Sequence, residues 1–359
     1  MSRTKLFDEI TLKRRQILEN HLDAIFPNVM ARLICTYDCY LEGKSFRFDC
    51  FPDRLPSTFD NPGDYTIHCI CALRDGRIVV GGNNVWKILN PLTGSCCATY
   101  THSLGSAICV AELHDGRIVI GLGASTTQLQ IWNLQTEKCD MILQNDEYIG
   151  KIVVLLDGRI MGSCFDMKSR HKGIVIKIWD LKNSSPGGSA AAAVDAVFSN
   201  HMSKCYTVDT CINMFPNGQI IVVTNHHSLA RWNPQTKDIH IISKNKYIHF
   251  MEALILSNGQ IIISDHYKLK ICTTTCYKKH KNENFRIIVD NSAFIYRIVE
   301  LPDERIAYLN NSKLEIFDLK NNNCDMVLTD DFDFITSIGV LPGGSIVCAS
   351  QEGMITIIN

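Results

Sequence analysis

The fold is indicated most clearly by one stretch of sequence, Ile108-Cys109-Val110-Ala111-Glu112-Leu113-His114-Asp115-Gly116-Arg117-Ile118-Val119-Ile120-Gly121. Its two apolar runs flank an Asp-Gly pair, and this arrangement predicts a β-hairpin because both residues accept positive φ. The same tight turn recurs, each time directly before an apolar run that begins with Ile: Asp75-Gly76-Arg77, Asp115-Gly116-Arg117, Asp157-Gly158-Arg159, Asn217-Gly218-Gln219, Asn258-Gly259-Gln260, Asp303-Glu304-Arg305 and Gly343-Gly344-Ser345. The chain is therefore built from one repeated hairpin.

The spacing of these turns sets the size of the repeated unit. Measured between first residues, the intervals are 40, 42, 60, 41, 45 and 40. A period of about 41 residues is typical of a propeller or another repeat array. The long interval contains residues 183–193, which are rich in Gly, Ser, Pro and Ala and which we interpret as a flexible insertion.

Each unit contains four short candidate strands. A third strand alternates apolar and polar residues, as in residues 129–133 and 175–180, and a fourth follows after a short turn, as in residues 139–143. Four strands in each of seven units predict an all-β fold, a seven-bladed β-propeller. The last unit ends at its third strand, so we expect the 46–60 segment to pair with the last blade and close the ring. The predicted domains are a small N-terminal α-helical extension, residues 1–43, and the propeller, residues 44–359.

Between about residues 60 and 359, the chain resembles the WD-repeat family. Trp132-Asn133, Trp179-Asp180, Trp232-Asn233 and Phe317-Asp318 stand where that family has its Trp-Asp pair. The chain lacks the Gly-His pair that usually precedes the first strand of each unit, so we expect blades that depend more on apolar packing than on polar networks. The resemblance implies a WD-repeat-like propeller that acts as a protein-protein interaction scaffold.

The N-terminal region carries a second resemblance. Residues 6–19 have an amphipathic helical pattern, and residues 25–37 are similar to the opening helix of an F-box through Pro27, Val29, Leu33, Ile34 and Tyr37. This likeness implies that these five residues dock onto an adaptor of a cullin-type ubiquitin ligase, with the propeller as substrate receptor. The alternative is that the helices cap the propeller and that the protein is a non-enzymatic structural or assembly scaffold with no ligase link.

Composition restricts the partners. The 36 basic and 37 acidic residues give a formal charge of -1, which argues against nucleic-acid binding. Neither a secretory signal nor an apolar run long enough to span a membrane is visible, so we expect a cytoplasmic or nuclear protein without membrane contact. The 16 cysteines suit a reducing compartment. Three of them, Cys96, Cys139 and Cys324, occupy one repeat position, where we expect them to pack as small hydrophobes.

The sequence predicts no catalytic, metal or cofactor site. No phosphate loop, nucleophile elbow or dinucleotide motif is present, so we expect no enzyme. His266, Cys272, Cys276 and His280 are zinc-ligand types, but they fall at opposite ends of one strand and cannot meet at one ion. The candidate partner-binding rim consists of loops between second and third strands: Arg170, His171, His226, His227, His266 and Tyr267. The alternative is that these side chains are merely solvated.

Overall fold

A computed structural model describes most of the repeat region, and the elements that it describes are β-strands. The described residues are 46–49, 66–123, 127–145, 147–165, 174–181, 193–198, 212–224, 228–244, 250–265, 267–272, 285–290, 294–310, 313–328 and 335–358. The predicted helical extension, with Pro27, Val29, Leu33, Ile34 and Tyr37, lies outside them.

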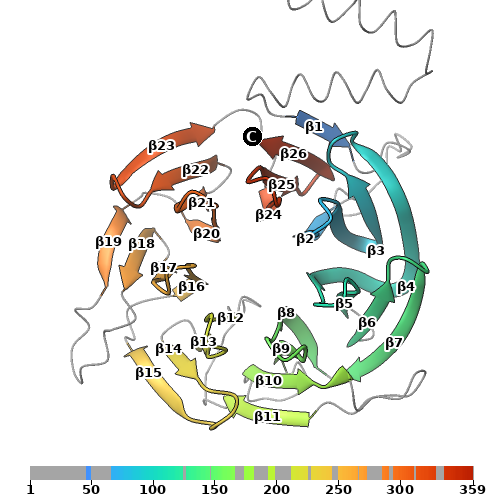
Figure 1. Cartoon of the computed structure of the whole chain (residues 1–359), viewed down its shortest axis with the longest axis horizontal. Helices are drawn as coiled ribbons and strands as arrows, with labels where there is room; N and C mark the ends of the chain where they lie inside the picture. Colours follow the sequence, from blue (N-terminus) through green and yellow to red (C-terminus); the bar gives the residue numbers. More distant parts are fainter. Residues whose placement is uncertain are drawn as a thin grey trace, which may run out of the picture.

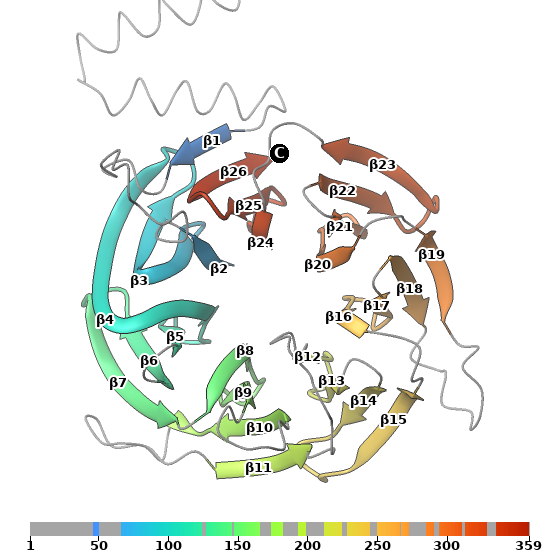
Figure 2. The same ribbon diagram turned by 180° about the vertical axis from the view of Figure 1, so that it is seen from behind.

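The strands form antiparallel sheets arranged as a ring (Figures 1 and 2). Four sheets are consecutive along the chain: β8 (Tyr148–Val154) to β11 (Ala193–Phe198), with β9 (Ile160–Phe165) and β10 (Ile174–Trp179) between them; β12 (Ile212–Met214), β13 (Ile220–Thr224), β14 (Ser228–Trp232) and β15 (Ile239–Lys244); β16 (Phe250–Ile255), β17 (Ile261–Asp265), β18 (Lys268–Cys272) and β19 (Arg286–Asp290); β20 (Ile295–Glu300), β21 (Arg305–Asn310), β22 (Lys313–Asp318) and β23 (Asn323–Leu328). The molecule is thus an all-β propeller.

The fifth four-stranded sheet joins the two ends of the repeat region. It contains β24 (Ile335–Val340), β25 (Ile346–Ser350), β26 (Met354–Ile358) and, at its outer edge, β1 (Phe46–Asp49). β1 runs antiparallel to β26, with Phe46 opposite Ile357 and Asp49 opposite Met354. The N-terminal side of the repeat region therefore supplies the outermost strand of the last sheet, where the backbone of β26 would otherwise be an open edge.

The prediction of seven separate blades is wrong in one respect: five four-stranded blades form, and the first two repeats share a six-stranded sheet. This sheet contains β2 (Ile67–Ala72), β3 (Ile78–Asn90), β4 (Ser95–Glu112), β5 (Ile118–Gly123), β6 (Thr127–Asn133) and β7 (Lys138–Asn145). Its continuity has a local cause at Asn83, which pairs with Ser106 in the strand ladder. The Asn83 Oδ1 also accepts a hydrogen bond from Ser106 Oγ at 2.6 Å and contacts His68 Nε2 at 2.7 Å. These contacts hold β3 and β4 together where the other repeats separate.

All seven predicted turns form, and they share one geometry. In each, an apolar residue two positions before the Asp-Gly pair, such as Leu73, donates its N–H to Arg77 O (2.8 Å) and accepts from Gly76 N (3.0 Å). The φ of Gly76 is 88°, and equivalent glycines and Glu304 also have positive φ, whereas Asp75 and its equivalents do not. Only the second residue of the Asp-Gly pair is therefore in the left-handed region. The hairpin is a type I turn with a glycine bulge rather than the turn with two positive φ angles that the dipeptide suggests.

Neighbouring repeats are joined by apolar clusters and by turn contacts. Ile67, Val80 and Leu89 pack with Val347 and Ile355 of the last sheet, which closes the ring by side-chain packing. The Arg74 guanidinium donates to Leu113 O at 2.7 Å, and the Ser257 N–H donates to Glu300 Oε2 at 2.8 Å. These two turns therefore bind the next repeat as well as closing their own hairpins.

The Trp-Asn and Trp-Asp pairs have two separate roles, because the Trp packs in the core and the polar residue closes the following turn. Trp179 and Trp232 are buried, whereas Asn233 Oδ1 accepts the N–H of Gln235 at 2.9 Å and so closes the turn after the third strand. The Trp179 indole N–H is buried and makes no hydrogen bond among the described residues. The three cysteines at one repeat position do follow these turns, but Cys96 and Cys324 are exposed and Cys139 is half-buried. Their predicted packing as small hydrophobes is wrong because the fourth strand lies at the outside of the ring.

Candidate binding site in the central channel

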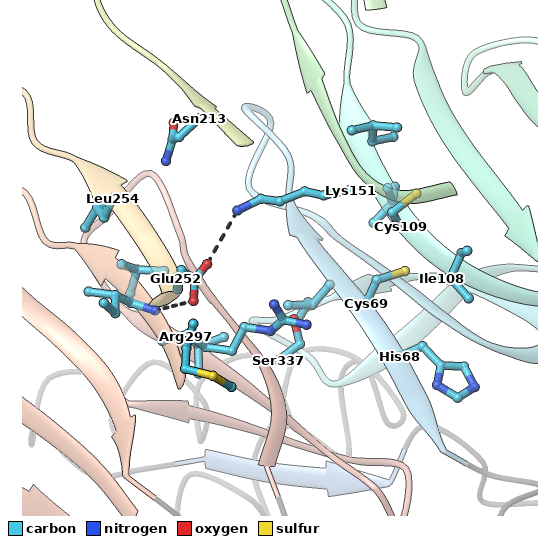
Figure 3. A pocket seen from close by; sticks show the side chains of 18 residues that line it. His68, Cys69, Ile108, Cys109, Lys151, Asn213, Glu252, Leu254, Arg297 and Ser337 are labelled. Carbon is cyan, nitrogen blue, oxygen red and sulfur yellow. Dashed lines mark hydrogen bonds and ion pairs between the residues drawn. The ribbon is translucent and has the colours of Figure 1, made fainter. Parts of the chain in front are cut away.

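The innermost strands of the ring enclose a cavity of about 340 Å³. Its lining comes from seven strand segments, on β2, β4, β8, β12, β16, β20 and β24, and these contact one another in order round the ring. Among the described lining residues, three side chains carry a full charge: Lys151, Glu252 and Arg297. Figure 3 shows Lys151 and Glu252 pointing toward each other from β8 and β16, with the guanidinium of Arg297 extending into the same cavity.

Glu252 makes two contacts that hold its carboxylate in place. Its Oε1 lies 3.4 Å from Lys151 Nζ, and its Oε2 accepts the backbone N–H of Ile298 at 3.1 Å. The Glu252 side chain is 11% exposed and that of Lys151 is 35% exposed. Because a buried carboxylate with a cation and an amide donor is well stabilised, Glu252 is held in position at the channel wall.

A β-bulge interrupts most inner strands at the same place. In β2, for example, Ile67 pairs with Gly82 and Cys69 with Gly81, so that His68 is the extra residue. β4, β8, β16 and β24 are bulged at the equivalent residue, five positions before the apolar residue of the turn. In β20 the bulge is displaced by one residue, because Tyr296 pairs with Leu309 and Ile298 with Tyr308. The extra residue of β20 is thus Arg297, whose φ is 54°.

The displaced bulge coincides with a larger residue on the second strand. In β2, β4, β8, β16 and β24, the first residue after the bulge pairs with a small residue on the second strand. These small residues are Gly81, Gly121, Ser163, Ser264 and Ala349. A Cβ added to Gly121 would lie 2.3 Å from Cys109 Sγ, so the facing side chain occupies that space. In β21 the equivalent residue is Leu309, which is fully buried. We infer that its bulk displaces Arg297 from the ladder and turns it into the channel.

One mouth of the channel carries an aromatic ledge, which we define as Tyr267, Phe294 and Tyr296. The rings of Tyr267 and Phe294 are 5.0 Å apart, and these two residues are 42% and 45% exposed. Phe294 and Tyr296 line a second cavity of about 180 Å³ that shares Glu252 and Arg297 with the central one. The ledge and the charged groups therefore form one continuous surface.

Cys69 and Cys109, the cysteines among the described lining residues, lie in surroundings that disfavour the thiolate. Cys69 and Cys109 are buried, and burial raises the pKa of the Cys109 thiol to about 12. Burial likewise raises the pKa of Cys69 well above its usual value, and the neighbouring Cys109 adds to this effect. A thiol in such surroundings is protonated at neutral pH and so contributes packing rather than chemistry.

The rim proposed from the sequence is only partly described. Tyr267 lies at the channel mouth, on the aromatic ledge, whereas Arg170, His171, His226, His227 and His266 lie outside the described residues. The three charged channel residues were missed. They share one repeat position, four residues before the apolar residue of each turn, where the sequence has Cys69, Cys109, Lys151, Cys211, Glu252, Arg297 and Ser337. Comparison of the repeats at that position could have revealed the charged set.

Comparison with known proteins adds no family assignment. No protein-family model matches the chain, and the search of curated proteins gives no match. The WD-repeat and F-box resemblances therefore rest on the residues quoted above. Within the part of the chain that the structure describes, no helix has the length and apolar character needed to cross a membrane.

Proposed function

We propose that the protein is a non-enzymatic protein-interaction scaffold that binds its partner across the aromatic ledge and the channel mouth. A β-propeller is commonly such a scaffold, because rigid sheets hold binding residues at the rim of the ring. The observation that carries the proposal is the continuity of exposed aromatic rings with a charged cavity. Aromatic residues and Arg are enriched at the centres of protein interfaces, and this surface combines exposed aromatic rings with Arg297.

The proposal is tested by capture of partners with matched surface variants. Phe294→Ser removes a ledge residue, and Leu92→Ser removes an equally exposed apolar residue (44% against 45%) in the turn between β3 and β4. The antiparallel strand order places this turn on the opposite face of the ring. We expect partners captured by the intact protein and by Leu92→Ser to be lost with Phe294→Ser. Retention of every partner by Phe294→Ser would contradict the proposal.

We further propose that the ring is a divergent WD-repeat propeller in which the six-stranded sheet counts as two blades. Seven turns with the same hydrogen-bond pattern and seven inner strand segments support this count. Leu73, Val79 and Trp86 pack with Ile118 and Ile120 inside the six-stranded sheet, as residues of adjacent sheets do elsewhere. The double variant Asn83→Ala, Ser106→Ala removes the side-chain hydrogen bond between β3 and β4. We expect the ring to stay assembled, with an unchanged radius of gyration in small-angle scattering.

The resemblance of residues 25–37 to an F-box helix favours a second, more specific proposal: the scaffold is a cytoplasmic substrate receptor of a cullin-type ubiquitin ligase. The adaptor contact would use Pro27, Val29, Leu33, Ile34 and Tyr37. Affinity capture with the Val29→Asp, Ile34→Asp variant tests this role. A cullin adaptor that copurifies with the intact protein and is lost with the variant is expected. A scaffold that never captures an adaptor has no ligase link.

A further inference from the structure

The central cavity has the size of a side-chain subsite. About 340 Å³ is at the low end for a ligand pocket and holds one or two side chains rather than a helix or a domain. It adjoins the smaller cavity beneath Phe294 and Tyr296, so a segment of partner chain lying on the aromatic ledge can reach it. An extended peptide fits this arrangement better than a folded surface does.

The charge of the cavity selects the group that it accepts. Lys151 and Arg297 supply two positive charges and Glu252 one negative charge, so the full charges among the described lining residues sum to +1. A carboxylate brings this sum to zero. A phosphate carries about −1.5 to −2 at neutral pH and would leave excess negative charge beside Glu252. The balance therefore favours a carboxylate.

Backbone strain marks Arg297 as the residue that meets this group. The other five non-glycine residues with positive φ in the described chain, Asn84, Glu137, Lys237, Glu304 and Asn322, lie at turns or at the register shift of β3. Arg297 alone among these six lies on a channel strand, where the bulk of Leu309 keeps it out of the ladder. Strained residues of this kind persist where the surrounding structure holds them, and they gather at binding sites. A guanidinium can bind a carboxylate with two parallel hydrogen bonds.

We propose that the cavity is a carboxylate subsite, in which an extended peptide lying on the aromatic ledge inserts one Asp or Glu side chain toward Arg297. The inference rests on the proposed scaffold function and names the chemistry of its partner. Leu309 is the positioning residue, since its size determines where the bulge falls. Lys151 and Glu252 form the wall against which the carboxylate is placed.

The test is selection of a displayed random dodecapeptide library on the intact protein, followed by binding measurements with the best synthetic peptide. We expect enrichment of one acidic position near an apolar or aromatic one. Changing that Glu to Gln in the peptide should weaken binding about 10- to 100-fold, the usual range for a charge-assisted hydrogen bond. Phosphoserine at the same position should bind more weakly than Glu. Free succinate at millimolar concentration should compete only weakly if the peptide's ledge contacts contribute.

Arg297→Gly separates binding from structural support. Glycine adopts positive φ without strain, so this variant should keep or raise the midpoint of urea unfolding while peptide affinity falls about 10- to 100-fold. The Glu to Gln peptide should bind the variant as the Glu peptide does. A lower unfolding midpoint, or unchanged affinity, would overturn the role of Arg297. Selected peptides without an acidic position would refute the carboxylate subsite but leave the scaffold function standing, whereas no enrichment at all would contradict both.

Discussion

Gly81 and Gly121 offer a matched test of the repeat geometry. They occupy the same position in successive repeats, opposite Cys69 and Cys109. A Cβ at Gly121 would be 2.3 Å from Cys109 Sγ, with its next neighbours at 3.5 Å or more. A Cβ at Gly81 would be 2.6 Å from Cys69 Sγ but also 2.8 Å from both the Cβ and the backbone O of Ala107. A thiol can rotate away, whereas the backbone of β4 cannot.

The two Gly→Ala changes should therefore differ in their effect on the free energy of unfolding. Overpacking against fixed atoms costs about 1–3 kcal/mol, and Ala recovers about 0.5–1 kcal/mol by restricting the unfolded chain. Gly81→Ala is expected to destabilise the protein by about 1–2 kcal/mol. For Gly121→Ala, the cost of rotating the Cys109 thiol nearly cancels the gain from restricting the unfolded chain. Its net effect on the free energy of unfolding is therefore about zero.

Urea unfolding of the full chain, followed by tryptophan fluorescence, measures both changes. Cys109→Ala combined with Gly121→Ala should remove the remaining clash, whereas Cys69→Ala should not rescue Gly81→Ala. Effects of the two glycine substitutions within about 0.5 kcal/mol of each other, with similar slopes against urea concentration, would refute the packing argument.

Three further outcomes follow from the turns and from a buried ion pair. Glu304→Gly should stabilise the protein by about 0.5–1 kcal/mol, because Glu304 has a φ of 68° where other repeats have glycine. Gly76→Ala is the reverse control in the same unfolding assay: nothing lies within 4 Å of the added Cβ, so the change should destabilise the protein through its positive φ alone. Burial raises the pKa of Asp75, but hydrogen bonds from the Arg77 side chain and N–H outweigh it and lower that pKa, and Asp115 and Asp157 behave likewise. These folded-state pKa values lie below the unfolded value of about 3.9. The stabilisation that the three carboxylates contribute is therefore complete above pH 5 and is lost as the pH falls through the folded pKa values. Replacing all three residues with Asn should flatten the dependence of the free energy of unfolding on pH between 5 and 2. Lys177 is buried and contacts Glu147, and its Nζ donates to Asn145 Oδ1 at 2.7 Å, so Lys177→Met should cost about 2–4 kcal/mol by leaving Glu147 unpaired, and Glu147→Gln should recover part of that loss in a double-mutant cycle.

The repeat and its turns could be predicted from the sequence because they depend on neighbours along the chain. An Asp-Gly-Arg segment contains its own ion pair, as Asp115 and Arg117 show with an oxygen-to-nitrogen distance of 2.8 Å. The turn geometry was predicted less well. Both members of an Asp-Gly pair tolerate positive φ, and the dipeptide alone does not say that only the glycine adopts it.

The joined sheet and the channel could not be predicted in the same way. Continuity of β3 with β4 depends on Asn83, whose side chain contacts His68 and Ser106 at sequence distances of 15 and 23 residues. The channel depends on residues from many repeats, such as Lys151 and Glu252, which are 101 positions apart. Histidine-rich loops attract attention in a single sequence, whereas the bulge at Arg297 becomes visible only in the strand pairing, where Leu309 faces Tyr296.

Site-specific photo-crosslinking tests the scaffold account most directly. Benzoylphenylalanine at position 294 places the photoreactive group on the aromatic ledge, and the same residue at position 92 places it in an exposed turn on the opposite face. We expect the partner captured by the intact protein to form a covalent adduct from position 294 and none from position 92. Adducts from position 92 without any from position 294 would contradict binding at the channel mouth.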